Sequence, residues 1–184
     1  MKKMILGIVI ASVVLYMWGF VYWGLGPYPT MIWKHAPDDA AAGQALLAHF
    51  PENGTYFVPG AGHDQATAEG LFDKGPVAMV HMIAANGRPM MDPSIMVGGF
   101  LLNVVVIGLI CILMSQVRAA LPTYVDRVKF IALAGVTASV LIDCGDIVWW
   151  QIDWSWKLYN ALYHVSAWVI TGLILAKFIE SAKN

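Results

Sequence analysis

Four long apolar runs dominate the pattern of hydrophobic and polar positions along this chain of 184 residues. They cover residues 4–25, 94–115, 128–150 and 158–179. A helix needs about 20 residues to cross a hydrocarbon core about 30 Å thick, and each run reaches that length. The pattern therefore predicts an all-α membrane protein, with four transmembrane helices bundled into a single membrane domain over residues 1–184.

Residues 26–93, between the first two runs, have a mixed pattern. Asp38 and Asp39 open an alanine-rich stretch that ends at Phe50, which is typical of a short capped helix. Residues 60–75 are rich in glycine and acids, and we predict a loop there. This part of the chain should lie outside the membrane.

Strand patterns follow in the same extramembrane segment. Residues 55–58 and 77–84 are typical of strands, and Asn86-Gly87 is a turn signal that predicts a returning strand over residues 88–91. Together with the helix, these elements predict a small α+β cap between the first two transmembrane helices, on the non-cytoplasmic side. Such a short segment buries little apolar surface, so we expect it to pack on the helix ends or on a partner.

Composition and charge support a membrane location. Hydrophobic residues make up 59% of the chain and charged residues 12%, whereas soluble domains carry about 25% charged residues. The basic residues near the ends of the runs gather on one side: Lys2, Lys3, Arg118, Arg127, Lys129, Lys177 and Lys183. The positive-inside rule then places both termini in the cytoplasm. The sequence contains no stripe of basic residues that would indicate nucleic-acid binding.

Polar residues inside the third and fourth runs are the main candidates for chemistry. The short connection between these runs makes the two helices antiparallel neighbours, and reflection about its middle brings Asp143 level with His164. Asn103 and Tyr16 fall at a comparable depth, and Asp146 lies about one turn closer to the interface. This layer can be a proton relay, a metal site or a polar pocket. It can equally be a structural contact that holds the bundle together.

Tryptophans gather where the third run ends and the fourth begins, at positions Trp149, Trp150, Trp154 and Trp156. Such residues are typical of an aromatic belt at the membrane interface. Stacking on a quinone or a lipid headgroup is the alternative interpretation. The pattern alone leaves both open.

A second candidate site lies in the extramembrane segment. Thioether and imidazole groups gather there, at Met79, His81, Met82, Met90 and Met91. Soft sulfur ligands with imidazole are what Cu(I) selects, so copper is a possible cofactor. Methionines beside a membrane more often serve in packing, which is the competing interpretation.

Several local patterns resemble a known family. They are Trp18-Gly19 near the end of the first run, PENGTYFVPG at residues 51–60, Gly75-Pro76, and the tryptophan-rich end of the third run. Together they resemble a family of small bacterial four-helix inner-membrane proteins that carries no functional name. The resemblance implies the same topology and a bacterial origin, and it transfers no catalytic residue.

The motifs of common enzyme classes are missing from the sequence, including phosphate-binding loops, dinucleotide fingerprints and zinc-protease motifs. We therefore expect no catalytic activity of the chain's own. The leading hypothesis is an accessory or structural subunit of a larger inner-membrane complex, respiratory or otherwise redox-active, with lipid and other membrane subunits as partners. The alternatives are a periplasm-facing copper-binding protein and a small membrane protein with an Asp/His proton relay.

Overall fold

A computed structural model describes residues 2–25 and 28–179. The chain forms two compact units by its internal contacts. The first comprises Met1–Trp33 with Pro93–Asn184, and the second comprises Lys34–Asp92. Each unit is described below by itself.

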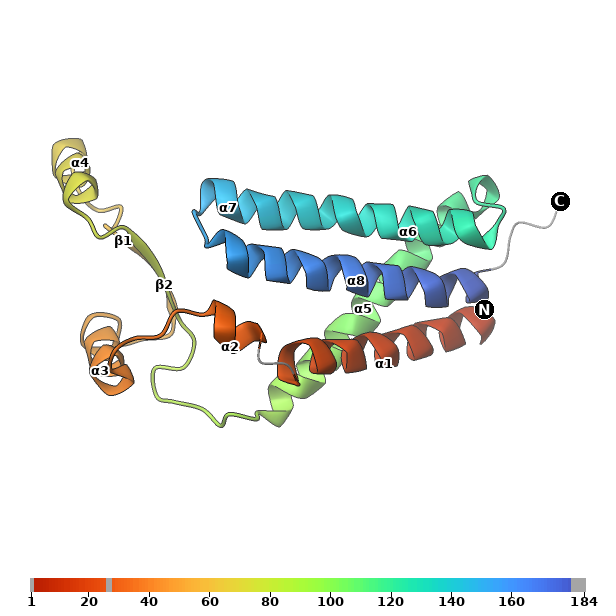
Figure 1. Ribbon diagram of the computed structural model, residues 1–184, viewed down its shortest axis with the longest axis horizontal. Coiled ribbons are helices and arrows are strands. Elements are labelled where there is room, and N and C mark those ends of the chain that lie inside the picture. Colours follow the sequence, from red (N-terminus) through yellow and green to blue (C-terminus); the bar gives the residue numbers. More distant parts are fainter. Residues whose placement is uncertain (1, 26–27, 180–184) are drawn as a thin grey trace. The chain divides into compact units, whose positions relative to one another are not determined.

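The first unit contains four helical segments that are long and apolar enough to cross a membrane (Figure 1). Their elements are α1 (Lys2–Gly24), α5 (Pro93–Val117), α6 (Tyr124–Ser139) with its continuation, and α8 (Trp154–Phe178). The sequence-based prediction of four long apolar helices is confirmed. A short helix α2 (Tyr28–Ile32) and a 3₁₀ turn η1 (Arg118–Ala120) complete this unit among the described residues.

Two of the long helices begin several residues before the apolar runs that predicted them, because capping residues fix their starts. In α6, Thr123 and Asp126 form a capping box, each side chain accepting from the other's backbone N–H. In α8, the carboxylate of Asp153 accepts from the backbone N–H of Ser155 at 2.9 Å. Polar caps extend each helix beyond its hydrophobic part.

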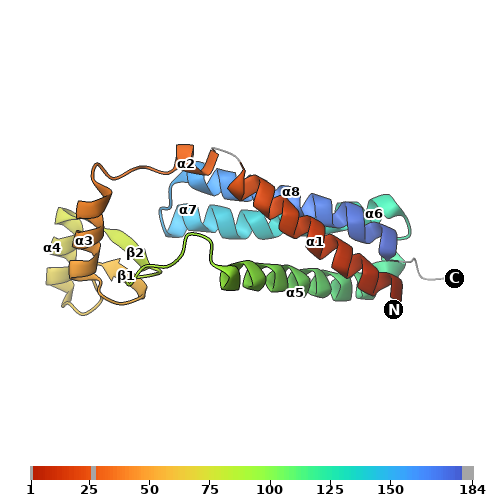
Figure 2. The same ribbon diagram turned by 90° about the horizontal axis from the view of Figure 1, so that it is seen from below.

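The third long segment changes its helical geometry midway. After α6 it passes through a π-helix, η2 (Val140–Cys144), and resumes as α7 (Gly145–Trp149). A four-residue connection then leads into α8, with Gln151 at a positive φ of 54°. α6 and α8 consequently run antiparallel and side by side, as both views show (Figures 1 and 2).

Close approach between helices depends on glycines at the contacts. A β-carbon added to Gly135 of α6 would lie 2.0 Å from Cγ of Trp168 in α8. One added to Gly7 of α1 would lie 2.7 Å from Cβ of Phe178. Around these contacts sits a core whose largest fully buried apolar side chains are Ile107, Met114, Ile131 and Leu175. Small residues therefore let α6 and α1 pack directly on α8.

The second unit is a small α+β arrangement. Helix α3 (Asp39–His49) is capped by Asp38, whose carboxylate accepts from the N–H of Ala41 at 3.0 Å. Strands β1 (Gly54–Val58) and β2 (Ala78–Met82) pair antiparallel. The predicted helix is present, and so are the strands predicted over residues 55–58 and 77–84. Their ends are shifted by one to two residues.

Two sequence-based predictions in this unit are wrong. Residues 60–75, predicted to be a loop, contain helix α4 (Gln65–Lys74), which Asp64 caps at its start and Gly75, with φ of 62°, ends. Residues 88–91 form no strand. The turn at Gly87 does not return the chain along β2, because β2 pairs with β1 instead.

Candidate functional site

The carboxylate of Asp143 is the centre of a polar cluster between the third and fourth long helices. Asp143 lies in the π-helix and is 2% exposed. Its Oδ2 accepts a hydrogen bond from the Ser139 hydroxyl at 2.7 Å and lies 2.8 Å from Nδ1 of His164. The antiparallel pairing of η2 with α8 thus puts Asp143 and His164 at one level, where reflection about the connection had placed them.

Lys157 bridges two carboxylates in the same cluster. It sits in the first turn of α8, is 7% exposed, and its Nζ lies 2.9 Å from Oδ1 of Asp143 and 2.8 Å from Oδ2 of Asp146. The contact with Oδ1 is an ion pair whose angles fall outside those of a directed hydrogen bond. Charge pairing of this kind makes burial of a carboxylate tolerable.

Lys157 and Ser139 were not singled out in the sequence. Two aspartates near the end of the third run, with the one lysine of that run at its other end (Lys129), were the available signal for Lys157. Ser139 precedes Asp143 by four residues, one helical turn, and that spacing was the signal for its hydrogen bond.

The two ring nitrogens of His164 have different environments. The ionised carboxylate of Asp143 only accepts hydrogen bonds, so Nδ1 carries the proton that they share. Nε2 of the neutral ring then keeps its lone pair, and within the described residues it has no hydrogen-bond partner. The His164 side chain is 36% exposed. Asp143 therefore orients an imidazole whose second nitrogen is available to another group.

Charge balance depends on the protonation of this imidazole. Two carboxylates, Asp143 and Asp146, face one ammonium group from Lys157. With His164 neutral the cluster carries one net negative charge, and with His164 protonated it is neutral. The low dielectric of an apolar bundle strengthens such interactions. A proton on His164 would therefore neutralise the cluster.

Aromatic residues fasten α1 to α8 beside the cluster. The hydroxyl of Tyr22 donates to the carbonyl of Tyr159 at 2.9 Å, and the hydroxyl of Tyr159 donates to the carbonyl of Tyr22 at 2.7 Å. The ring of Tyr163 contacts those of Tyr22 and His164, with centroids 5.3 and 5.7 Å apart. His164 is thus held between a carboxylate on one helix and an aromatic contact on its own.

The four tryptophans proposed for an interfacial belt divide into two groups. Trp149, Trp150 and Trp154 are 80%, 57% and 66% exposed around the connection between α7 and α8. Trp156 is half-buried, and its ring lies tilted by 60° against that of Trp23, with ring centroids 5.6 Å apart. The belt stays a prediction for the three exposed side chains, whereas Trp156 joins the aromatic contact between α1 and α8.

Tyr16 and Asn103 are not part of the cluster around Asp143. The ring of Tyr16 packs edge-on against Phe100, with centroids 5.7 Å apart. Asn103 is half-buried on α5. In the described part of the chain, neither forms a hydrogen bond with Asp143, whose partners are Ser139, Lys157 and His164. Similar depth in the bundle does not by itself bring side chains together.

The methionine and histidine residues proposed for copper do not all lie on one face of strand β2. Side chains alternate between the faces of a strand, so Met79 and His81 share one face and Met82 lies on the other. Nδ1 of His81 is 2.7 Å from the hydroxyl of Thr55 on β1. Met90 and Met91 are exposed, at 100% and 65%. Among the described residues, no group of three His, Cys, Asp or Glu side chains is placed to hold a metal ion.

Comparison with known proteins returns no relative. No protein-family model, no curated protein and no solved structure matches the chain.

Proposed function

We propose that this chain is a multi-pass protein of a bacterial inner membrane in which Asp143 and His164 form a proton relay. The observation that carries the proposal is a carboxylate, 2% exposed, hydrogen-bonded to a histidine inside helices apolar enough to span a bilayer. Ionisable groups at such positions are costly and usually serve an ion or proton pathway. The exposed side of His164 gives the pair a donor or acceptor position toward another molecule.

Proton transfer through the pair follows from its hydrogen bonding. A proton that arrives at Nε2 of His164 converts the ring to an imidazolium, which can release its Nδ1 proton to Oδ2 of Asp143. One proton enters and one leaves, so the ring returns to a neutral state with its tautomer reversed. Asp143 then holds the transferred proton as a neutral acid. The relay resets when this proton returns to Nδ1 of His164 and Nε2 releases its own proton toward the exposed side.

The neighbouring groups set the starting state. Lys157 favours the ionised form of Asp143, and Ser139 holds Oδ2 in place with its hydroxyl. Asp146, whose side chain is 30% exposed, connects Lys157 to the more accessible part of the site. Asp146 is thus the group through which the cluster meets water at the tryptophan-rich end.

Nitrogen-15 NMR of histidine-labelled full chain in lipid nanodiscs tests the relay. We expect the resonances of His164, recorded over a range of pH, to report an Nδ1–H tautomer whenever the ring is neutral. Asp143→Asn should remove the tautomer preference, because an amide can donate as well as accept. The matched control is Asp153→Asn, which changes a carboxylate that caps α8 outside the cluster.

The outcome that contradicts the relay is equally definite. If His164 keeps the same protonation and tautomer across that pH range, it transfers no proton and its bond with Asp143 is structural. The same holds if Asp143→Asn and Asp153→Asn give identical spectra. Correct folding of both variants is checked by their melting temperatures in the same nanodiscs.

The proposed topology has both termini in the cytoplasm and residues 26–93 outside. Its support is the set of basic residues near one end of the bundle, including Lys2, Arg118 and Arg127. Single cysteines placed at Gly62 and at Asn184, in a chain whose two native cysteines are replaced, report the two sides. We expect an impermeant maleimide to label position 62 in sealed cells and to leave position 184 unlabelled. Labelling of position 184 would refute this topology.

A second proposal is that the chain is an accessory subunit of a larger membrane complex. It is supported by Gly98, Gly99 and Gly108 of α5, where an added β-carbon would meet nothing within 4 Å. Small residues with open space beside them allow another helix to approach closely. A redox complex is the kind of partner that would use a proton relay, so the two proposals are compatible.

Purification in mild detergent followed by mass spectrometry tests this second proposal. A tagged wild-type chain should retain a stoichiometric membrane partner. Gly98→Leu with Gly99→Leu should lose it without unfolding, because both positions face open space. Leu133→Ala, at a side chain 67% exposed on α6, is the control. A wild-type chain that purifies alone would count against the proposal.

A further inference from the structure

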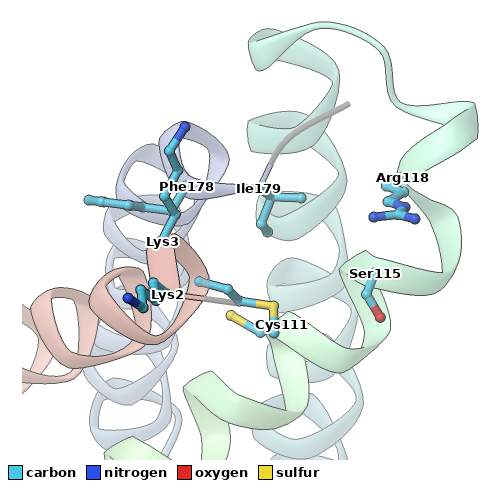
Figure 3. Close-up of a pocket in the computed structure, with 8 residues that line it drawn as sticks. Lys2, Lys3, Cys111, Ser115, Arg118, Phe178 and Ile179 are labelled. Carbon is cyan, nitrogen blue, oxygen red and sulfur yellow. The ribbon is translucent and has the colours of Figure 1, made fainter. Parts of the chain in front are cut away.

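A cavity of about 350 Å³ lies where α1 begins and α5 and α8 end, at the opposite end of the bundle from the connection between α7 and α8. Figure 3 shows the residues around it: Lys2 and Lys3 of α1, Cys111 and Ser115 of α5, Arg118 of η1, and Phe178 with Ile179 at the end of α8. It is distinct from the cluster around Asp143, and no proposal above uses it.

Positive charge dominates the polar lining of this cavity. Lys2, Lys3 and Arg118 contribute three cationic groups, and no carboxylate belongs to the lining residues that the structure describes. In Figure 3 the lysines of α1 and Arg118 lie on different sides of the opening. Cationic groups from separate elements around one space are suited to surround an anion.

The rest of the lining is apolar. Met4, Phe178 and Ile179 contribute hydrocarbon surface, and Cys111 at the base is 1% exposed. Phe178 is fixed there because its Cβ packs directly over Gly7 of α1, where no side chain intervenes. A free inorganic anion would gain nothing from this surface. A molecule with an anionic head and a hydrocarbon part would use both.

Position in the bundle narrows the class of molecule. The cavity lies at the ends of three helices that are each apolar enough to span a bilayer. In a membrane those ends reach the headgroup region, where a basic pocket between helices meets anionic lipid heads. This step rests on the membrane insertion proposed above and is independent of the proton relay.

We propose that this cavity binds an anionic phospholipid. Its phosphate group lies between Lys2 and Arg118, and the glycerol and upper acyl region lie against Met4, Phe178 and Ile179. Arginine supplies a planar set of donors that matches phosphate oxygens, and Lys2 supplies a compact charge. The site fastens α1 to α5 and α8 through a shared ligand at the end of the bundle.

Native mass spectrometry of the full chain with defined lipids tests the site. The probes are phosphatidylglycerol, phosphatidylcholine and inorganic phosphate. We expect wild type to retain phosphatidylglycerol in preference to phosphatidylcholine. Lys2→Gln with Arg118→Gln should weaken phosphatidylglycerol binding roughly tenfold to thirtyfold, since each basic group near a lipid head contributes about as much as a fivefold change in affinity.

The control variant is Lys177→Gln with Arg88→Gln, which removes the same number of charges from residues outside the cavity lining. It should bind phosphatidylglycerol as wild type does. Equal loss in both double variants would mean a diffuse charge effect and would overturn the site. Displacement of the lipid by millimolar phosphate would assign the cavity to a free anion instead and would overturn the lipid proposal.

Two further measurements separate this inference from the proposed function. Melting temperatures of the variants in phosphatidylcholine show whether each chain folds, and a Lys2→Ala, Arg118→Ala pair replaces any glutamine variant that does not. Membrane fractionation shows whether the chain inserts. A chain that inserts and keeps its relay, yet loses no lipid affinity in either cavity variant, refutes only the lipid site.

Discussion

Nδ1 of His164 and Oδ2 of Asp143 lie 2.8 Å apart, although 20 residues of chain separate the two positions. They meet because α8 runs back along the third helical segment after a four-residue connection. This contact joins the two helices at a level where Lys157 and Ser139 also reach the same carboxylate. A proton relay and a purely structural contact both require this short distance. The contribution of the contact to the free energy of unfolding can be measured separately from the protonation of His164.

A double-mutant cycle on Asp143 and His164 measures the energetic part. Each single change to Ala should lower the free energy of unfolding in detergent, because it leaves the other group without its partner. The double change should cost less than the sum of the two. Coupling between intramembrane polar pairs averages about 0.6 kcal/mol, so that is the expected size. Strictly additive losses would show that the contact contributes no coupling.

Removal of Lys157 should be the most damaging single change in the cluster. Lys157→Met keeps the hydrocarbon stem but leaves Asp143 and Asp146 without their shared cation. Breaking a buried pair in this way costs about 3 kcal/mol. Adding Asp146→Asn should restore part of the loss, because one of the two stranded charges is then removed. Chemical unfolding of the two variants beside Lys177→Met as control would show whether this rescue occurs.

The contact between Gly135 and Trp168 predicts an unusual effect of alanine. In an exposed helix Gly→Ala usually stabilises by about 0.5 to 1 kcal/mol. At Gly135 the new β-carbon would lie 2.0 Å from Cγ of Trp168, so α6 and α8 must separate. We expect a loss of about 1 to 3 kcal/mol. Gly98→Ala, where nothing lies within 4 Å, is the comparison, and a loss of equal size there would refute the packing argument.

The cap of helix α4 should respond to acid. Hydrogen bonds from the side chain and backbone of Thr67 hold the pKa of Asp64 below its ordinary value of 3.8. The folded-state pKa is therefore lower than the unfolded one. The stabilisation is complete above the unfolded pKa and disappears as pH falls through the folded pKa.

Amide exchange at Thr67 reports this cap directly. Protection should fall as pH drops below about 3.8 in wild type, after correction for the intrinsic pH dependence of exchange. Asp64→Ala should show weak protection at every pH. Asp73→Asn, near the other end of α4, should leave the wild-type profile unchanged. A profile that is the same with and without Asp64 would contradict the cap.

Helices and their pairing could be predicted because they follow from long apolar runs and a short connection. The level of Asp143 against His164 needs only residue counting along two antiparallel helices. The cap at Asp38 and the strands around Thr55 and His81 likewise carry local signals. Elements whose signals lie in neighbouring residues of the sequence can therefore be predicted from it.

Other features depend on information that residue counting omits. Tyr16 and Asn103 were expected at the depth of Asp143, yet Tyr16 packs against Phe100 and Asn103 has no hydrogen bond with Asp143 among the described residues. Lys157 lies seven residues before His164, and its long side chain still reaches Asp143, which level-matching of backbones does not consider. Helix α4 was not predicted because the glycines in residues 60–75 indicated a loop. One of them, Gly75, instead ends the helix that Asp64 begins.

The π-helix at Val140–Cys144 sets which residues of the third helical segment face the polar cluster, so its extra residue should be present wherever the buried charges are present. A π-turn holds one residue more than an α-turn, and deletion of that residue would rotate the following segment by about 100°. Ser139 and Asp143 would then be three residues apart, and Asp146 would turn away from Lys157. Among descendants of a common ancestor, a one-codon gap here should therefore coincide with neutral residues at positions 143 and 157. The insertion and the buried charges would be inherited together or lost together.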